Sequence, residues 1–263
     1  MERSAMAFTA SLEITQDQID QYQQEGYFIL ESIFSHDELE ILRGECDRFV
    51  EETDAELAKG KGNNGITHQG KRYFIPNTHT RSAHMYNYAF SPVFAAICRA
   101  TLGEEAVLFL DQMVVKSAEK GLPFSWHQDS GYLSFDHPPY LTCWATLDDV
   151  TIENGTVSLL PYSQLGIKTR VKHIRAPEHN DMVGYFGENP GIPVIVPAGS
   201  IAVFSSVCFH RSGPNTTDKP RRAMLTQYAS APILNPETNR AMFDGQQFLR
   251  EGKIVAAGFS QQA

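Results

Sequence analysis

The sequence predicts a mainly β protein with flanking helices, arranged as a β-barrel or a double-sheet jelly roll. Two features of the chain indicate this fold. From residue 106 onwards, short β-rich runs alternate with turn signals at residues 153–155, 190–191 and 197–200, a pattern typical of barrels and jelly rolls. Before residue 106 the chain carries helix-start signals instead, so helices are expected beside the β core.

The first of these signals is a capping box of the form T-x-x-Q at residues 15–18. Its reciprocal hydrogen bonds favour a helix start. Gly26 favours the end of that helix, because glycine readily adopts the left-handed conformation found there. Residues 27–30 are then expected to form a short apolar strand.

A second capping box at residues 35–38 predicts a long helix that ends near Gly60. Residues 60–72 are rich in glycine and basic residues, which indicates a mobile loop. Ser91, followed by a proline at the first helical position, predicts another helix, which ends at Gly103.

Hydrophobic residues make up 42% of the 263 residues, enough for a sizeable core. This length is normal for a single β-barrel with helices. We therefore expect one domain over residues 1–263, with a helical buttress at about 15–105 and a β core at about 106–230. Three apolar runs are expected to form strands of that core: residues 106–115, 201–204 and 223–228.

The candidate chemistry lies in a few polar residues beside these strands. His127 and Asp129 are two positions apart, which would put both side chains on one face of an extended strand. With His210 they offer two imidazoles and one carboxylate, the facial triad that holds non-haem Fe(II) and leaves open positions. Arg221 comes eleven residues after His210, and its guanidinium suits a carboxylate held by two hydrogen bonds.

Each signal alone has a simpler interpretation. His127 and Asp129 by themselves fit a turn with a hydrogen-bonded histidine, and an isolated arginine fits a surface salt bridge. The neighbouring strands favour the metal hypothesis, because a metal site requires a rigid framework. Two histidines and one carboxylate also bind catalytic zinc in hydrolases, so the residues leave that metal open.

Several motifs follow one another in a recognisable order: residues 26–30 after a short helix, residues 126–129 with the ligand motif, residues 143–149, 153–155 and 160–163 as a central hairpin, and residues 210–215 with 221–222 as a closing motif. In this order they resemble the phytanoyl-CoA dioxygenase-like family of Fe(II)/2-oxoglutarate-dependent oxygenases. The resemblance covers most of the chain, over residues 15–230.

The resemblance implies a double-stranded β-helix, a cupin-like jelly roll with helices packed on one sheet. It also implies that His127, Asp129 and His210 bind Fe(II), and that 2-oxoglutarate and O₂ are consumed to give succinate and CO₂. An unactivated C–H bond of a small molecule would be oxidised. Because related halogenases have a small residue in place of Asp129, the carboxylate here implies hydroxylation or another oxygenation.

The same resemblance assigns the cosubstrate contacts. Arg221 would pair with the distal carboxylate of 2-oxoglutarate, Ser212 would add a hydrogen bond to it, and Trp144 would form a wall of the pocket. Arg222 could exchange roles with Arg221, but strand alternation lets only one of them point inward. Gln112 and Lys116 are four positions apart on one face of a strand, where they either line the cosubstrate pocket or face solvent.

The remaining histidines have weaker claims to a functional role. For His79 and His84 a structural role is favoured over substrate contact, and His137 precedes two prolines and is expected in a turn. His173 lies in the basic run at residues 168–175, interpreted as a solvated face or as a lid over an anionic substrate. The basic residues of the other loop keep an acyl-CoA thioester open as a substrate: Lys59, Lys61, Lys71 and Arg72.

Composition excludes several other classes. The net charge is −9, and the absence of a basic patch with interleaved aromatic residues disfavours nucleic-acid binding. No apolar run is long enough for a membrane span, and residues 1–14 lack the apolar core of a secretory signal. The four scattered cysteines fit reduced, buried thiols. We expect a cytoplasmic protein, and the sequence leaves open whether it forms a homodimer.

Three functional hypotheses follow. The first is a 2-oxoglutarate-dependent hydroxylase or oxidase of a small molecule, in specialised metabolism, with a phytanoyl-CoA-type acyl-thioester hydroxylase as its variant. The second is a zinc-dependent hydrolase that uses the same triad. The third is a non-catalytic jelly-roll binding module, which the complete triad and Arg221 make least favoured.

Overall fold

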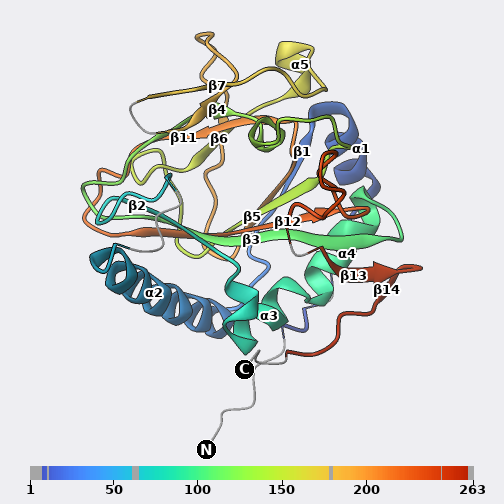
Figure 1. Ribbon diagram of the computed structural model, residues 1–263, viewed down its shortest axis with the longest axis horizontal. Coiled ribbons are helices and arrows are strands. Elements are labelled where there is room, and N and C mark those ends of the chain that lie inside the picture. The colour runs from blue at the N-terminus through green and yellow to red at the C-terminus, as the bar shows by residue number, and fades with distance from the viewer. Residues whose placement is uncertain (1–7, 11, 61–64, 178–179, 244, 260–263) are drawn as a thin grey trace, which may run out of the picture.

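A computed structural model describes residues 8–10, 12–60, 65–177, 180–243 and 245–259. Lys61 lies outside these described residues. So do residues 62–64 of the predicted loop and most of residues 1–14, the segment that lacks the apolar core of a secretory signal. The mainly β fold with flanking helices is confirmed: two antiparallel sheets face each other, and helices cover the outer face of the larger one (Figure 1).

The larger sheet runs in the order β1-β10-β5-β12-β3-β13-β14, and β2 also pairs with β3. Its strands are β1 (Tyr27–Leu30), β2 (Arg72–Pro76), β3 (Ala106–Lys116), β5 (Leu141–Thr146), β10 (Ile201–Ser205), β12 (Arg221–Ala229), β13 (Gln246–Arg250) and β14 (Lys253–Ile254).

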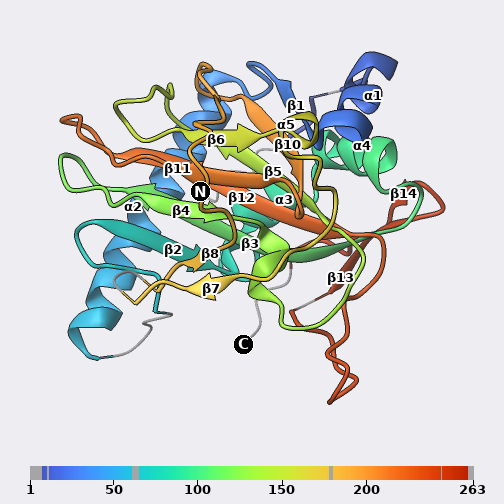
Figure 2. The same ribbon diagram turned by 90° about the horizontal axis from the view of Figure 1, so that it is seen from above.

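The smaller sheet runs in the order β4-β11-β6-β9. Seen from above, it lies over β3, β5 and β12 of the larger sheet (Figure 2). Its strands are β4 (Phe124–His127), β6 (Val157–Leu160), β9 (Ile192–Pro193) and β11 (Phe209–Ser212), and a separate hairpin is formed by β7 (Ile174–Arg175) and β8 (Met182–Val183).

The helices begin where the capping signals predicted. The Thr15 and Ser35 boxes are both formed, and Gly26 ends the first helix with φ 84°. Ser91 precedes its helix but makes no side-chain cap hydrogen bond. The helices are α1 (Gln16–Glu25), α2 (His36–Ala58), α3 (Ala83–Ala89), α4 (Pro92–Thr101) and α5 (Tyr162–Leu165), with 3₁₀ turns η1 (Thr78–Thr80) and η2 (Asp129–Tyr132).

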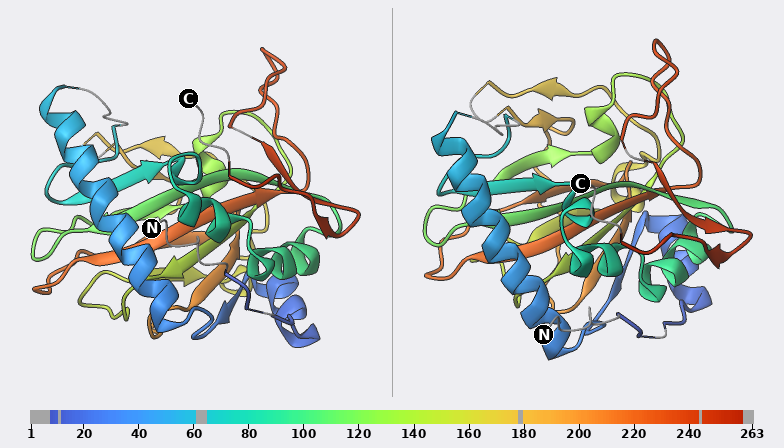
Figure 3. Two further views of the ribbon diagram at one scale, coloured as in Figure 1. Left: turned by 90° about the horizontal axis from the view of Figure 1, so that it is seen from below. Right: turned by 60° about the horizontal axis from the view of Figure 1, so that its bottom comes forward.

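The larger sheet separates two apolar clusters because its side chains alternate between its faces. On its outer face Met113 and Met224 pack against α2, α3 and α4, which cover this face when the molecule is seen from below (Figure 3). On its inner face Val114, Trp144 and Leu225 pack toward the smaller sheet. The space between the two sheets is therefore where a site can lie.

Two sequence-based boundaries were wrong. The β core is wider than residues 106–230, because strands from both ends of the chain, β1 and β13, belong to the same sheet. Residues 60–72 are not a mobile loop throughout, since Arg72 is fully buried and opens β2. β13 was not predicted because its five residues are too few for alternation to be recognised, and the predicted strand at residues 27–30 could not be assigned to this sheet from its sequence.

The four cysteines, Cys46, Cys98, Cys143 and Cys208, are buried free thiols, as predicted. Among the described residues no helix combines the length and the apolar character that a membrane crossing requires.

If β13 is part of the core, Leu249→Ala will lower the free energy of unfolding by about 2–5 kcal/mol, because the fully buried side chain leaves a cavity. Urea denaturation measures this change. Ile254→Ala on the exposed β14 is the control and should change stability by less than about 0.5 kcal/mol. Equal effects of the two substitutions would show that β13 does not share the core.

Candidate metal centre

The two candidate histidines lie side by side on neighbouring strands of the smaller sheet. His127 ends β4, His210 lies on β11, and the two are direct partners in the antiparallel ladder. Their ring centroids are 4.1 Å apart. The β framework thus fixes both imidazoles in one place, as the sequence suggested.

Asp129 does not share a strand with His127, contrary to the expectation from their spacing. The strand ends at His127, and Asp129 opens η2. Gln128 between them keeps an extended backbone, with φ −106° and ψ 139°. Because successive extended residues point in opposite directions, the side chains on either side of Gln128 still lie on the same side.

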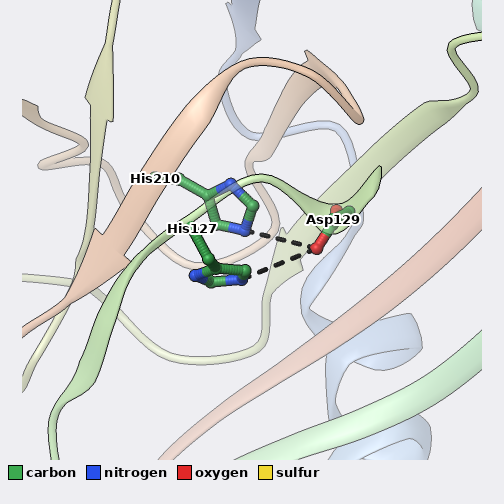
Figure 4. Close-up of side chains that lie close together, drawn as sticks. All are labelled: His127, Asp129 and His210. Carbon is green, nitrogen blue, oxygen red and sulfur yellow. Dashed lines mark ion pairs between the residues drawn. The ribbon is translucent and has the colours of Figure 1, made fainter. Parts of the chain in front are cut away.

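The three side chains converge on one point (Figure 4). One carboxylate oxygen of Asp129, Oδ1, lies 3.6 Å from His127 Nε2 and 3.5 Å from His210 Nε2. The ligand atoms of all three residues lie within 4.8 Å of one another, and all three residues are buried. This is the one such group of three or more His, Cys, Asp or Glu residues within the described part of the chain.

Hydrogen bonds fix the orientation of both imidazoles. His127 Nδ1 lies 2.8 Å from the Ser125 carbonyl oxygen, and His210 Nδ1 lies 3.1 Å from that of Cys208. Each Nδ1–H therefore donates to a carbonyl, which leaves the Nε2 lone pair free toward Asp129. Burial, and then His210, lower the pKa of His127 to about 4, so its ring is neutral and able to bind a metal at neutral pH.

The second carboxylate oxygen of Asp129 is held by the larger sheet. Thr142 Oγ1 on β5 donates to Oδ2 at 2.6 Å, and Gln227 Nε2 on β12 donates to it at 2.9 Å. Burial would raise the pKa of Asp129, but the interaction of its carboxylate with the His210 and His127 imidazoles outweighs burial and holds the pKa below its usual range. Oδ1 is thereby left to face the two imidazoles as an ionised candidate ligand.

A buried cation faces the same cavity from one end of the larger sheet. Arg221 Nη2 donates to the Gly155 carbonyl at 3.1 Å, whereas Nε and Nη1 have no hydrogen-bond partner among the described residues. Its guanidinium lies 5.5 Å from the Trp144 ring centroid. Burial lowers the pKa of Arg221 to about 10, so it stays charged at neutral pH.

Lys116 is the direct partner of Arg221 across the β3–β12 ladder. Its ammonium donates to the Gly213 carbonyl. Burial, and then Arg221 and Arg72, lower the pKa of Lys116 well below its usual value. This end of the cavity, named the cationic end here, contains the charged Arg221 and the Lys116 amine. An anion such as a carboxylate would stabilise the charged forms of both groups.

Comparison with known proteins decides the family. The model of the phytanoyl-CoA dioxygenase (PhyH) family matches residues 22–223. The chain belongs to the phytanoyl-CoA dioxygenase family. It is an Fe(II)- and 2-oxoglutarate-dependent dioxygenase, and the buried triad of two imidazoles and one carboxylate fits such an iron site.

Individual relatives are distant. An ectoine dioxygenase from Bordetella bronchiseptica is 25% identical over 244 residues, which cover 85% of this chain and 78% of the relative. A methylphosphonate hydroxylase from Gimesia maris is 28% identical over 227 residues, which cover 82% of this chain and 80% of the relative. Among solved structures, a non-haem α-ketoglutarate-dependent carbocyclase from nogalamycin biosynthesis has a TM-score of 0.67 and 20% identity, with 91% of this chain and 95% of that chain covered.

The structure of this family member brings the other candidate residues into one cavity of about 380 Å³. Gln112, Trp144 and Ser212 line it together with the triad, Lys116 and Arg221. Gln112 and Lys116 therefore face the cavity and not solvent. Their contacts with a cosubstrate stay a prediction.

Arg222 lies on the opposite face of β12, as strand alternation predicted. Its Nη2 donates to Asp148 at 2.8 Å, and its Nη1 donates to Asp47 of α2 at 3.2 Å. Arg221 is thus the arginine that faces the cavity.

The other histidines have structural partners outside the triad. His79 lies in η1, where its ring meets Asp111, and His84 Nδ1 lies 3.2 Å from Glu45 of α2. His137 Nε2 lies 3.0 Å from Ser130 Oγ, in a connection between η2 and β5.

His173 itself is buried, although Lys168, Lys172 and Arg175 of the surrounding basic run are exposed, as expected for a solvated face. His173 Nδ1 lies 2.9 Å from the Val171 carbonyl, and its Nε2 accepts the backbone N–H of Gln128 at 2.9 Å. The ring is buried against Gly131, where a Cβ atom would approach it to 2.5 Å. His173 therefore holds the backbone between two candidate ligands.

His173 belongs to a segment, residues 169–177 and 180–184, that we call the strap. The strap also makes two hydrogen bonds with the side-chain amide of Gln128. Gln128 Nε2 donates to the Thr169 carbonyl, and Gln128 Oε1 accepts from Val171 N, both at 2.9 Å. Gly184 N donates to the Trp126 carbonyl at 2.9 Å. The strap thus pairs with the ligand motif like an irregular strand, a role that its sequence does not signal.

A buried ion pair anchors the far end of the strap. Arg72 Nη2 donates to Asp181 Oδ1 at 2.8 Å, and neither side chain is more than 1% exposed. Asp181 Oδ2 also accepts the backbone N–H of Ser125 at 3.3 Å. One ion pair therefore ties β2, the strap and the strand that ends at His127.

Thr142→Val will weaken metal binding about 10- to 100-fold, because the isosteric change removes a donor to the candidate ligand Asp129. An anaerobic Fe(II) competition titration with a chromophoric chelator measures the affinity. The matched control is Thr146→Val on the same strand, whose hydroxyl bonds to the Pro197 carbonyl. Equal affinities in both variants would show that Thr142 does not support a ligand.

Asp181→Leu will lower the free energy of unfolding by about 3–5 kcal/mol, because it leaves the Arg72 guanidinium buried without its carboxylate. Urea denaturation measures the change. The double variant Arg72→Met/Asp181→Leu removes both charges and should regain most of the loss. A double variant less stable than the single one would contradict this account.

Proposed function

We propose that His127, Asp129 and His210 hold Fe(II), and that the cationic end holds the distal carboxylate of 2-oxoglutarate. The observation that supports the second assignment most strongly is the pair of unpartnered buried nitrogen atoms on Arg221. A buried charged donor without a partner is costly, and a carboxylate at this end of the cavity would supply acceptors for the free N–H groups of the guanidinium.

Lys116 and Ser212 are the other proposed contacts of the cosubstrate. Lys116 would add a second cation beside Arg221, and the Ser212 hydroxyl lines the same cavity next to the ligand strand. Trp144 would form a flat wall, because its ring already packs against the guanidinium. Gln112 would border the middle of the cosubstrate.

When bound, Fe(II) and 2-oxoglutarate would supply the oxidising power with O₂ and release succinate and CO₂. The protein's own part is to position the metal ligands and to exclude water. The imidazoles present Nε2 lone pairs, Thr142 and Gln227 keep Asp129 Oδ1 turned toward them, and the apolar walls keep bulk water from the centre. The reaction proposed is oxidation of an unactivated C–H bond in a small molecule.

A small-molecule substrate is supported by the size of the cavity and by the names of the relatives, which point to ectoine and methylphosphonate. The acyl-CoA alternative loses support, since several of the basic residues invoked for it are paired. Arg72 is buried with Asp181, and Arg170 donates to Asp136. The zinc-hydrolase alternative gives no role to the free nitrogens of Arg221.

Arg221→Met will raise the Kd for 2-oxoglutarate about 10- to 150-fold, the range for loss of hydrogen bonds to a charged group. Calorimetric titration of the Fe(II)-loaded protein under anaerobic conditions measures this Kd. The side-chain volume is nearly kept, so the lost interaction is the charge and its donors.

Arg222→Met is the matched control, because Arg222 follows on the same strand and points away from the cavity. It should leave the Kd for 2-oxoglutarate unchanged while lowering stability. An equal rise in both variants, or no rise in Arg221→Met, would contradict the assignment of the cosubstrate site.

A further inference from the structure

The end of the cavity opposite Arg221 has a different chemical character. Gln227 lies six residues beyond Arg221 on β12 and bonds to Asp129, so this end begins about 20 Å along the strand from the Arg221 backbone. Beyond it, five cavity-lining residues form what we call the aromatic end: Phe109, Leu133, Tyr140, Met242 and Phe243.

The rings of the aromatic end pack against one another. The Phe109 centroid lies 4.6 Å from that of Tyr140 and 4.8 Å from that of Phe243, with the latter pair perpendicular. Leu133 and Met242 belong to the same apolar cluster. A surface of this kind favours a flat, apolar body that fits between rings.

No charged group that could pair with an ionic substrate lies at this end among the described lining residues. The cations that line the cavity are Lys116, Arg211 and Arg221. The guanidinium of Arg211 lies 4.8 Å from the Trp126 ring and donates to the Pro190 carbonyl. Arg211 therefore already has partners on the smaller sheet and its connection to β9. An anion at the aromatic end would be buried without a partner, which is costly.

Two polar atoms at the border of the aromatic end lack partners among the described residues. The Tyr140 hydroxyl lines the cavity with no hydrogen bond, although the residue is only 3% exposed. Gln227 Nε2 donates to Asp129 and to Thr142, whereas Gln227 Oε1 has no hydrogen bond with a described residue. A hydrogen-bond donor on Tyr140 and an acceptor on Gln227 are therefore available in the cavity that contains the candidate metal ligand.

The position of the Tyr140 side chain is fixed before a ligand binds. Its ring is held between Phe109 and a nearly parallel His137, 5.8 Å away, and its backbone N–H donates to Ser206 Oγ at 2.9 Å. A fixed donor can orient a ligand with little loss of side-chain entropy.

We propose that the aromatic end binds an uncharged ring compound that carries a hydroxyl or carbonyl oxygen, and that Tyr140 donates a hydrogen bond to this oxygen. The proposal rests on the proposed function, since it names the class of substrate whose C–H bond is presented to the metal centre. Small phosphorus anions and free carboxylates would not be held at this end.

Equilibrium dialysis of 2-naphthol and naphthalene, which differ by one hydroxyl group, tests the proposal on metal-free protein. The wild type should bind 2-naphthol about five- to tenfold more tightly, the difference expected for one hydrogen bond. Tyr140→Phe should abolish this preference and leave the Kd of naphthalene unchanged, because the ring is retained.

Tyr132→Phe is the matched control. The Tyr132 ring lies against Phe124 and His127 and is not one of the rings of the aromatic end, and its hydroxyl is held at the backbone N–H of Met182 at 3.2 Å, so the variant should keep the preference for 2-naphthol. A preference that survives in Tyr140→Phe, equal binding of both probes to the wild type, or no binding of either probe would overturn the proposal.

A third probe, 2-naphthoate, tests the exclusion of charge. Its binding should be weaker than that of 2-naphthol, and any binding should be lost when 2-oxoglutarate occupies the cationic end of the Fe(II)-loaded protein. Tight binding that persists with 2-oxoglutarate would contradict an uncharged substrate. The two dialysis probes require neither metal nor cosubstrate, so their result stands apart from the Arg221→Met test of the proposed function.

Discussion

A buried, ionised Asp129 is the constraint on which the rest of this structure depends. Removal of a carboxylate from water costs several kcal/mol even after relaxation, and the surrounding groups have to offset that cost. Thr142 and Gln227 donate to one oxygen, and His127 and His210 face the other. These partners come from β5, β12, β4 and β11, so both sheets must close before the carboxylate is stabilised.

The same alternation of side chains that closes the core also gives the cavity its polarity. Inward positions of β12 carry Arg221 near one end and Gln227 near the other, with Leu225 between them. Position along one strand therefore separates a cationic end from an aromatic end, and the candidate metal ligands lie beside the second. The strap completes the arrangement, because it hydrogen-bonds to Gln128 and leaves the flanking side chains free to point inward.

Local rules were sufficient to predict the capped helices and the long apolar strands. They also indicated that His127, Asp129, His210 and Arg221 face one cavity, as the structure shows, while the roles of these residues stay a proposal. These rules failed where a role depends on contacts between distant segments. Gln227 could have been found, since it lies an even number of positions from Arg221 and so shares its face. The buried roles of His173, Asp181 and Tyr140 could not, because each depends on how an irregular connection folds back onto the ligand motif, and such connections lack a periodic pattern.

The most direct test of the account is an anaerobic titration of the wild-type protein with Fe(II) followed by 2-oxoglutarate, monitored by visible absorption. The account predicts a weak charge-transfer band that saturates at one equivalent of Fe(II) and of 2-oxoglutarate, and that is lost in Asp129→Ala although the variant stays folded by circular dichroism. A folded wild-type protein that gives no band, or an Asp129→Ala variant that gives the same band, would contradict the assignment of His127, Asp129 and His210 as the iron site.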